Sequence, residues 1–389
     1  MMENAKRLFV SNPGAVGVAP SVQASLARTG GRVDYSKNPM LVYWEMTQAC
    51  ALACRHCRAE AMATPHPNEM THEESRSLLR QILAFGRPLP HLILTGGDPM
   101  QRPDVFALID EARALGLSVS ITPSATPNLT RTAIERLQQH GIESLGLSLD
   151  GSDAARHELV RGVAGCYDWT MRALRDAGEL GLPVQVNTLV SAETVDDLPA
   201  IYALLQTMPV MRWSLFFLIA VGRGRMLNPI SPELGEQWMD KIYDWTRTAP
   251  FAIKTTEAPS YRRVALNRMR AEGMSAESIE RTPMYRGFGI RDGHGILFVS
   301  NQGEVYPAGF LPLKAGDVRS GHLVDIYRNS PVFRALHAPE KFLGKCGRCE
   351  YRALCGGSRA RAYAHTGNAL ASDPFCPYPP RTASASASV

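Results

Sequence analysis

Short apolar runs alternate with amphipathic stretches along most of the chain. Six runs rich in β-branched and aromatic residues predict strands at 41–47, 91–96, 118–124, 144–150, 184–190 and 213–219. Each is followed by apolar positions at helical spacing, at 71–86, 103–115, 130–140, 167–180, 197–206 and 231–247. Six strand and helix units in series build a parallel sheet with right-handed crossovers. The pattern therefore predicts an α/β fold with a parallel sheet at its centre.

Six such units make a partial (β/α)6, TIM-like barrel that is open on one side, since a full barrel needs eight. We assign this barrel to residues 39–250, after a loosely attached arm at 1–38. A connecting helical segment is expected at 251–294, and an extension at 295–380 that starts with a hairpin at 295–310. The tail at 381–389 has low complexity and is expected to be disordered.

Composition and charge exclude some classes of protein. The chain has 389 residues, of which 45% are hydrophobic and 20% charged, as in an ordinary globular protein. Its longest apolar run, 213–221, is far shorter than the roughly 20 residues of a membrane helix, and its start lacks a secretory signal. We therefore expect a cytoplasmic protein with no membrane partner. The net charge of +5 does not by itself imply nucleic acid, although the excess gathers near the C-terminal cysteines.

Seven of the eight cysteines fall into two groups, and only Cys166 stands alone, as a small half-buried apolar side chain would. Disulfides are not expected in a reducing compartment. The first group has the spacing C-x3-C-x2-C. A structural zinc site needs four ligands, and a [4Fe–4S] cluster is normally held by four thiolates. Three thiolates leave one iron open to a small molecule, so the first group, Cys50, Cys54 and Cys57, predicts a functional metal site.

The cysteine triplet after the first strand, followed by "TGGDP" at 95–99 in this barrel order, resembles the radical S-adenosylmethionine (SAM) superfamily. The resemblance implies that SAM chelates the open iron and is cleaved by one electron to a 5′-deoxyadenosyl radical, which abstracts a substrate hydrogen. The electron would come from a donor such as flavodoxin or ferredoxin. It also implies SAM-binding residues: backbone at Gly96, Gly97 and Asp98 for the amino group, His56 near the adenine, Ser148 and Asp150 for the ribose, Arg161 for the carboxylate, and Asn187 for the nucleoside.

Each of these motifs also has a purely structural interpretation. "GGDP" is often only a turn, and "SLDG" at 148–151 is compatible with a strand end followed by a capping aspartate. Arg161 is compatible with an ordinary surface position. The order of the motifs, after the second, fourth and fifth strands, favours the functional interpretation because chemistry gathers at the carboxyl ends of parallel strands.

The second cysteine group allows structural zinc or a fully ligated iron–sulfur cluster by spacing alone. Its block resembles the SPASM, or twitch-like, extension that adds auxiliary [4Fe–4S] clusters to radical SAM enzymes. That pattern expects two further cysteines, where this chain has Ala308 and Arg359. The resemblance therefore implies two [4Fe–4S] clusters in total, with the second one held by Cys346, Cys349, Cys355 and Cys376.

The segments "WEMTQACALACRHCRAEA", "TPSATP" and "VGRG" resemble the branch that contains enzymes of heme and heme d1 biosynthesis and peptide maturases. This implies an oxidoreductase or lyase that decarboxylates or trims propionates of a modified tetrapyrrole. An alternative is the modification or cross-linking of a ribosomal peptide. A metal-dependent nucleic-acid-binding protein is a third possibility, but no basic, aromatic strand pair suggests stacked bases.

Residues that contact the substrate are the hardest to assign, and the sequence identifies no catalytic side chain. Surface charge at a helix start or loop explains the same residues equally well. His294 is a weaker candidate than the four that we assign as substrate contacts, which are Arg223, Tyr261, Arg262 and Arg263.

Overall fold

The structure is a computed structural model, which describes residues 33–287 and 289–381. The expected N-terminal arm, up to residue 32, and the expected tail, from residue 382, lie outside the described residues. Residues 33–38, the last part of the expected arm, are packed against the protein. Tyr35 is buried there, and its backbone carbonyl accepts a hydrogen bond from the Tyr327 hydroxyl.

The six predicted strands are present, and their chain order is their order in the sheet. All five pairings between them are parallel, as the alternating pattern predicts. The α/β class and the partial barrel are therefore confirmed. These strands are β1 (Leu41–Glu45), β2 (His91–Thr95), β3 (Val119–Ile121), β4 (Ser144–Ser148), β5 (Val184–Val190) and β6 (Arg212–Phe217).

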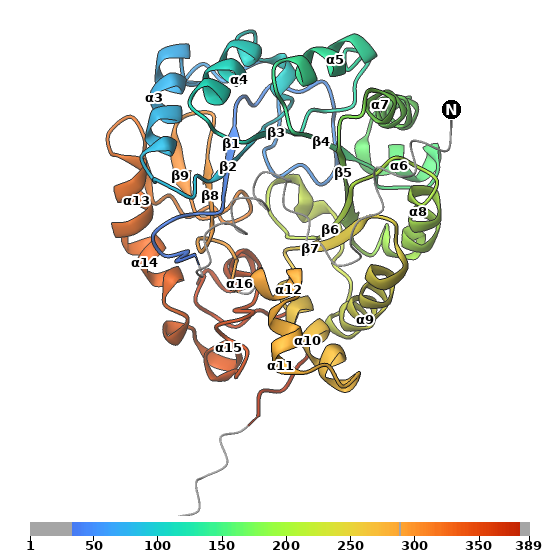
Figure 1. The fold of residues 1–389 in the computed structure, drawn as a ribbon, viewed down its shortest axis with the longest axis vertical. Coiled ribbons are helices and arrows are strands. Elements are labelled where there is room, and N and C mark those ends of the chain that lie inside the picture. The colour runs from blue at the N-terminus through green and yellow to red at the C-terminus, as the bar shows by residue number, and fades with distance from the viewer. Residues whose placement is uncertain (1–32, 288, 382–389) are drawn as a thin grey trace, which may run out of the picture.

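Helices surround these strands, as Figure 1 shows. Each covers the sheet with an apolar stripe; Leu78, Leu79 and Ile82 of α3, for example, are fully buried. A capping box of Thr71 and Glu74 fixes the start of α3. The helices are α3 (His72–Leu83), α4 (Val105–Ala114), α5 (Arg131–Gln139), α6 (Ala154–Arg161), α7 (Cys166–Leu180), α8 (Leu198–Leu205) and α9 (Pro232–Thr248), of which the pattern missed only α6.

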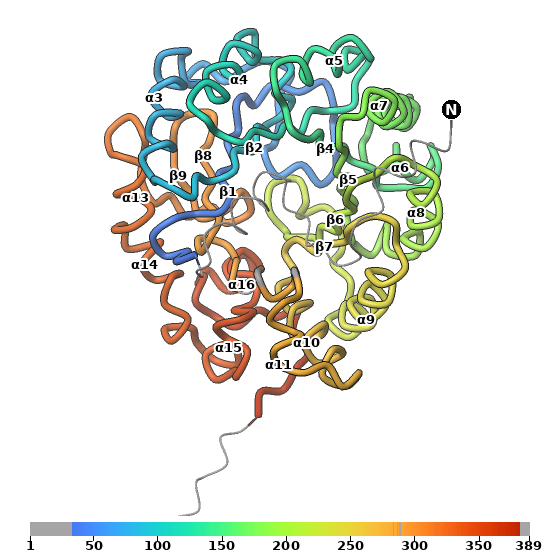
Figure 2. Tube along the Cα trace, viewed as in Figure 1, coloured from blue at the N-terminus to red at the C-terminus, as the bar shows by residue number. Residues whose placement is uncertain are grey.

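Two further parallel strands flank the predicted six. β7 (Ala252–Thr256) pairs with β6, within the expected connecting segment, and was not predicted. β8 (Ile296–Val299) pairs with β1 and forms the predicted hairpin with β9 (Glu304–Tyr306). Figure 2 shows this orange segment beside the blue first strand. The short β10 (Gly316–Asp317) ends the sheet on that side and β7 ends it on the other, so the barrel stays open.

The remaining helices cover the open side and the C-terminal part of the chain (Figure 1). The first three of these helices lie in the range predicted as a connecting helical segment, and the last four lie in the predicted extension. They are α10 (Tyr261–Ala271), α11 (Ala276–Glu280), α12 (Pro283–Arg286), α13 (Leu323–Asn329), α14 (Pro331–His337), α15 (Gly344–Arg348) and α16 (Arg359–Thr366).

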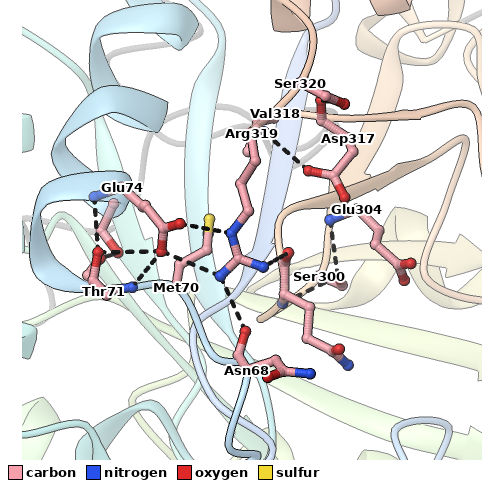
Figure 3. Close-up of polar contacts among 12 residues, drawn as sticks. Asn68, Met70, Thr71, Glu74, Ser300, Glu304, Asp317, Val318, Arg319 and Ser320 are labelled. Atoms are coloured by element: carbon pink, nitrogen blue, oxygen red, sulfur yellow. Dashed lines mark hydrogen bonds and ion pairs between the residues drawn. The ribbon is translucent and has the colours of Figure 1, made fainter.

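Arg319 fastens the C-terminal hairpin to α3 (Figure 3). Its guanidinium lies 2.7 Å from the Glu74 carboxylate and donates to the backbone carbonyls of Asn68, at 3.1 Å, and Gln302, at 2.9 Å. The hydrogen bond from Arg319, together with the bonds from Thr71, lowers the pKa of Glu74 to about 2. The part of the chain that begins at β8 is thus tied to the first helix of the barrel.

Across the described residues, no helix combines the length and the apolar character that crossing a membrane requires.

Candidate active site

A cavity of about 490 Å³ lies inside the barrel and reaches its carboxyl-terminal edge. Each of the eight parallel strands contributes to its wall, and so do the loops after β1, β2 and β7. Its size is in the range of small-molecule sites. All three cysteines of the first group line it, and Cys166 lines it too. The sequence-predicted triplet therefore opens onto the main cavity of the described protein.

The cysteine loop is held by contacts to its sulfur atoms. The Leu52 backbone N–H donates to Cys50 Sγ at 3.4 Å, and the Ser124 hydroxyl lies 3.2 Å from the same sulfur. Arg161 Nη1 lies 3.7 Å from Cys54 Sγ. Hydrogen bonds and positive charge at sulfur are the features that stabilise thiolates and tune iron–sulfur centres. "TPSATP", which contains Ser124, thus contributes directly to the site.

The glycines of "GGDP" are required by close backbone packing. The Gly97 N–H donates to the Thr47 carbonyl at 2.8 Å, and a side-chain carbon at Gly97 would lie 2.4 Å from the Ala49 carbonyl oxygen. A side-chain carbon at Gly96 would lie 2.5 Å from the Thr47 carbonyl oxygen, and the φ of Gly96 is 150°. These contacts press the turn against the cysteine loop, so the two motifs form one unit.

Asp98 serves this turn, not the cavity. Its side chain accepts hydrogen bonds from the backbone N–H of Met100, at 3.1 Å, and Ser124, at 3.3 Å, while its own N–H donates to Ala49. Burial raises the pKa of its carboxyl. The side chain is therefore a cap for the short turn at Pro99–Gln101.

Arg161 and Asp150 form a buried ion pair beside the cysteine loop. Arg161 Nε lies 2.6 Å from Asp150 Oδ2, and Asp150 Oδ1 accepts from the Leu189 N–H at 2.7 Å. Burial opposes ionisation of Asp150, but Arg161 outweighs it and holds the pKa of this carboxyl below its usual value. The surface interpretation of Arg161 is wrong, because its guanidinium joins Asp150 to Cys54.

His56, Ser148 and Asn187 all line the cavity, as expected of residues that would contact SAM. Burial lowers the pKa of His56 to about 4, so its imidazole is neutral near pH 7, and its Nδ1 is buried without a partner among the described residues. Asn187 accepts a hydrogen bond from the Gln185 amide at 2.7 Å. An orphaned ring nitrogen in a cavity wall suits a ligand with hydrogen-bonding edges, such as adenine.

The C-terminal cysteines have different surroundings: none of the four lines the cavity. Backbone N–H groups point at three of their sulfurs, at 3.4 Å from Tyr351 to Cys349, 3.4 Å from Gly357 to Cys355 and 3.3 Å from Asp373 to Cys346. Burial raises the pKa of the Cys355 thiol to about 12. Sulfurs that accept from N–H donors fit a bound metal centre, which supplies the positive charge that thiolates need.

Arg359 and Ala308 occupy the two positions where the SPASM pattern expects further ligands. Arg359 is fully buried, donates to the Ala369 carbonyl at 2.9 Å and stacks 4.5 Å from the Phe342 ring. Its Nη2 lies 3.6 Å from Cys346 Sγ, so a cation replaces a ligand beside this group. Ala308 is packed in an apolar cluster with Leu311 and Leu336.

Across the described ranges, no three His, Cys, Asp or Glu side chains converge closely enough to hold a single metal ion. The cluster ligands at both groups therefore stay predictions.

Comparison with known proteins decides the family. A profile of the Radical SAM superfamily matches residues 44–205, which include the cysteine loop and "GGDP". The AdoMet-dependent heme synthase of Nitratidesulfovibrio vulgaris is 37% identical over 90% of this chain and 95% of its own length. The chain belongs to the radical SAM superfamily. The Fe-coproporphyrin III synthase of Methanosarcina barkeri, another relative, is 30% identical over 87% of this chain and 88% of its own length.

Solved structures confirm the radical SAM fold. Streptococcus suis SuiB bound to S-adenosylmethionine has a TM-score of 0.66, with 15% identity over 88% of this chain and 78% of that chain. SuiB is also known bound to its precursor peptide SuiA. The superfamily binds SAM and a [4Fe–4S] cluster, so the chain is a radical SAM enzyme.

The structure separates the predicted substrate contacts. Tyr261 and Arg262 line the cavity. Arg223 instead donates to the backbone carbonyls of Cys54, at 3.0 Å, and Ala61, at 3.3 Å, and so braces the cysteine loop. Arg263 pairs with Glu236, and His294 with the Gly289 carbonyl, and neither lines the cavity. Each of these three side chains thus has a local partner, and the assignment of Arg223 and Arg263 as substrate contacts stays a prediction.

Sequence reasoning missed several charged residues in the cavity wall. No motif marks them, because each is a single charged residue in a strand or loop whose inward orientation depends on the sheet. β7, which carries one of them, was itself not predicted. They are Arg212, Lys254, Glu257, Arg291 and Asp292.

Proposed function

We propose that this radical SAM enzyme oxidatively decarboxylates propionate side chains of an iron porphyrin to vinyl groups, and so produces heme. The observation that carries the proposal is an excess of cations in the cavity. Four side chains that line it have no ion-pair partner within the described protein: Arg212, Lys254, Arg262 and Arg291. The other two cations of the wall, Arg58 and Arg161, are paired with Glu45 and Asp150.

The two unpaired carboxyls of the cavity wall do not offset these cations. Glu257 and Asp292 share a hydrogen bond, and burial together with their mutual repulsion raises the pKa of Glu257 well above its usual value. A pair of neighbouring carboxyls in this situation retains a proton. The cavity is therefore positively charged, which suits a substrate that carries several carboxylates.

The names of the two relatives support the same class of substrate. An iron coproporphyrin carries four propionates, and heme carries two propionates and two vinyl groups in the same positions. The substrate reaction balances as follows. A propionate loses a hydrogen atom from the carbon next to the ring, and the carbon radical then loses carbon dioxide and one electron to leave a vinyl group.

The cofactors would be held by residues already described. We assign the SAM-binding cluster to Cys50, Cys54 and Cys57, and SAM to the wall that contains His56 and Asn187. When bound, these groups supply a 5′-deoxyadenosyl radical that removes the substrate hydrogen. The chain itself keeps Cys54 beside the Arg161 guanidinium and keeps His56 neutral.

The electron released by decarboxylation needs an acceptor. We assign a second [4Fe–4S] cluster to the four C-terminal cysteines, and this cluster is the acceptor that we propose. Arg359, 3.6 Å from Cys346 Sγ, favours this role, because a nearby cation favours the reduced state of a cluster. Gly357 and Ser358 lie between the two regions: they follow Cys355 in the chain and line the cavity.

The experiment uses iron coproporphyrin III deuterated at the propionate carbons next to the ring. Anaerobically reconstituted, reduced enzyme is incubated with this compound and SAM, and the products are analysed by mass spectrometry. We expect deuterium in 5′-deoxyadenosine and a porphyrin that has lost carbon dioxide and two hydrogens for each vinyl formed. The Cys54→Ala enzyme is the control and should give neither product.

5′-Deoxyadenosine without deuterium, together with an unchanged porphyrin, would overturn the proposed substrate while leaving the radical chemistry intact. The same assay with candidate precursor peptides then tests peptide modification, because deuterium transfer from a labelled peptide is the corresponding signal.

A further inference from the structure

Two of the unpaired cations lie deep in the barrel, on adjacent strands. Lys254 of β7 is in register with Ser214 of β6, which is in register with Asn187 of β5. Lys254 therefore lies at the same height along the barrel as Asn187, which belongs to the part of the cavity wall that we assign to SAM. Arg212 lies on β6 two residues before Ser214, about 7 Å further toward the base of the barrel.

Neither cation has a counter-charge among the described residues. Arg212 is 7% exposed; its Nη1 donates to the Gln185 side chain at 2.9 Å, and its Nε is buried without a partner. Lys254 is half-buried and lines the cavity, and no hydrogen bond or ion pair holds its ammonium group within the described protein.

The neighbouring groups do not offset the two charges. Tyr43 of β1 and His91 of β2 face the two cations across the barrel. Burial raises the pKa of Tyr43 to about 12 and lowers the pKa of His91 to about 4. Both side chains are therefore neutral near pH 7. Glu257, a carboxyl of the same cavity wall, accepts a hydrogen bond from Ser358 and shares one with Asp292. A buried guanidinium beside a half-buried ammonium, without an anion, is unfavourable for folding.

We propose that Arg212 and Lys254 form a carboxylate-binding subsite inside the barrel, which anchors one propionate of the substrate. The inference rests on the proposed function for the identity of the substrate, but not for the subsite itself. An ammonium and a guanidinium that converge on a cavity are the pair expected for a bound carboxylate. Arg262 and Arg291, the other unpaired cations, instead lie near Cys355, toward the C-terminal region.

The charge state of Lys254 reports on occupancy of the subsite. Burial, and then the neighbouring Arg212, lower the pKa of Lys254 to about 7 in the ligand-free protein. A bound carboxylate favours the ammonium form and so raises this pKa. Binding near pH 8 should therefore be accompanied by proton uptake at Lys254.

The first test uses sodium propionate as the probe and does not depend on the porphyrin. The holoenzyme is labelled with ¹³C at the lysine ε-carbons, and the Lys254 signal is assigned by its loss in Lys254→Met. We expect propionate to raise the titration midpoint of Lys254 by about one pH unit or more. The effect should disappear in Arg212→Gln and persist in Lys341→Met, which removes an exposed lysine. A midpoint that propionate does not move would overturn the subsite.

The second test measures binding of iron coproporphyrin III by absorbance titration. We expect Lys254→Met and Arg212→Gln to weaken binding at least tenfold, while Lys341→Met binds as the wild type does. Equal binding by all four proteins would overturn the subsite and leave the proposed function standing. If the wild type fails to bind the porphyrin but still responds to propionate, the proposed function fails and the subsite stands.

Thermal unfolding separates this role from a structural one. Lys254→Met removes an unpaired, half-buried charge and keeps the length of the side chain, so we expect its melting temperature to equal or exceed that of the wild type. A fall in melting temperature, together with unchanged binding of propionate, would instead assign Lys254 to the packing of the barrel.

Discussion

The three cysteines near the start of the chain and the four near its end offer the same donor atom in different surroundings. The first three line the main cavity, and the Arg161 guanidinium and the Ser124 hydroxyl contact two of their sulfurs. The last four are separated from the cavity, and backbone N–H groups contact three of their sulfurs. The first group, which we call the open group, thus faces a cavity that a small molecule can occupy. The second, which we call the enclosed group, does not face it, and its Cys346 and Cys355 are buried.

This difference indicates how one chain can separate two tasks. Radical generation needs a metal position that a cofactor can reach, and the open group provides one. Electron transfer or structural support needs only a saturated, enclosed centre. Arg359 and Ala308 strengthen the distinction, because they fill the positions of further ligands with a cation and an apolar side chain.

The largest effect should come from Cys54→Ala, which removes a ligand of the open group. We expect no 5′-deoxyadenosine from SAM and a fall in iron from about eight to about four atoms per chain, because the enclosed group keeps its cluster. Quantitative mass spectrometry and iron analysis of the reconstituted protein measure both.

Full cleavage activity in this variant would refute the assignment of Cys54 as a cluster ligand. About twelve irons in the wild type would show that Arg359 and Ala308 do not exclude a third cluster.

Cys349→Ala makes the opposite change, in the enclosed group. We expect SAM cleavage to persist, because Cys349 does not line the cavity, while the yield of decarboxylated product per 5′-deoxyadenosine falls several-fold. The ratio of the two products, from single-turnover reactions, is the measurement. An unchanged ratio would restrict the enclosed group to a structural role.

Two glycines test whether each group depends on its own close backbone contact. In Gly97→Ala the new carbon would lie 2.4 Å from the Ala49 carbonyl, and in Gly357→Ala it would lie 2.7 Å from the Asp373 side chain, where φ is also +67°. Overpacking of this kind costs about 1–3 kcal/mol. We expect Gly97→Ala to impair SAM cleavage and Gly357→Ala to lower only the iron of the enclosed group.

Gly181→Ala is the matched control for these variants, because Gly181 also has a positive φ, +73°, but nothing lies within 4 Å of the added carbon. It should retain both clusters. Loss of iron at both groups in either test variant would mean that the two groups fold as one unit.

The sequence was most informative where local pattern and tertiary structure agree. Strands such as β5, whose sequence is VQVNTLV, were predicted close to their observed bounds. β7 was missed because "AIKTT" is short and carries Lys254, which faces the barrel although a lysine in a strand suggests solvent. The pairing of β8 with β1 joins segments about 250 residues apart, and no local signal specifies such a contact.

The candidate site was predictable to the extent that it consists of motifs. The cysteine loop, "GGDP" and Arg161 come together as expected because the carboxyl ends of parallel strands share one edge. The sequence does not reveal that Arg223 and Arg263 have local partners, the Cys54 carbonyl and Glu236, so their assignment as substrate contacts stays a prediction. Arg212 was missed for the opposite reason, since nothing local marks a cation that lacks a partner.

The smallest effect concerns the attachment of the C-terminal region to the barrel. Arg319→Gln removes the ion pair with Glu74, in which both side chains are about one third exposed, so we expect a loss of only about 0.5–1 kcal/mol. Hydrogen exchange of the β9 and β10 amides should become about two- to fivefold faster, while both clusters remain and the exposed Arg270→Gln control shows no change. Because the hydrogen bonds from Arg319 and Thr71 together lower the pKa of Glu74 from 4.5 to about 2, the contribution is present above pH 4.5 and is lost only as the pH falls toward 2. The effect should therefore be constant between about pH 6 and 8. A pH-dependent effect in that range, or loss of iron from the enclosed group, would show that the hairpin contributes more than attachment.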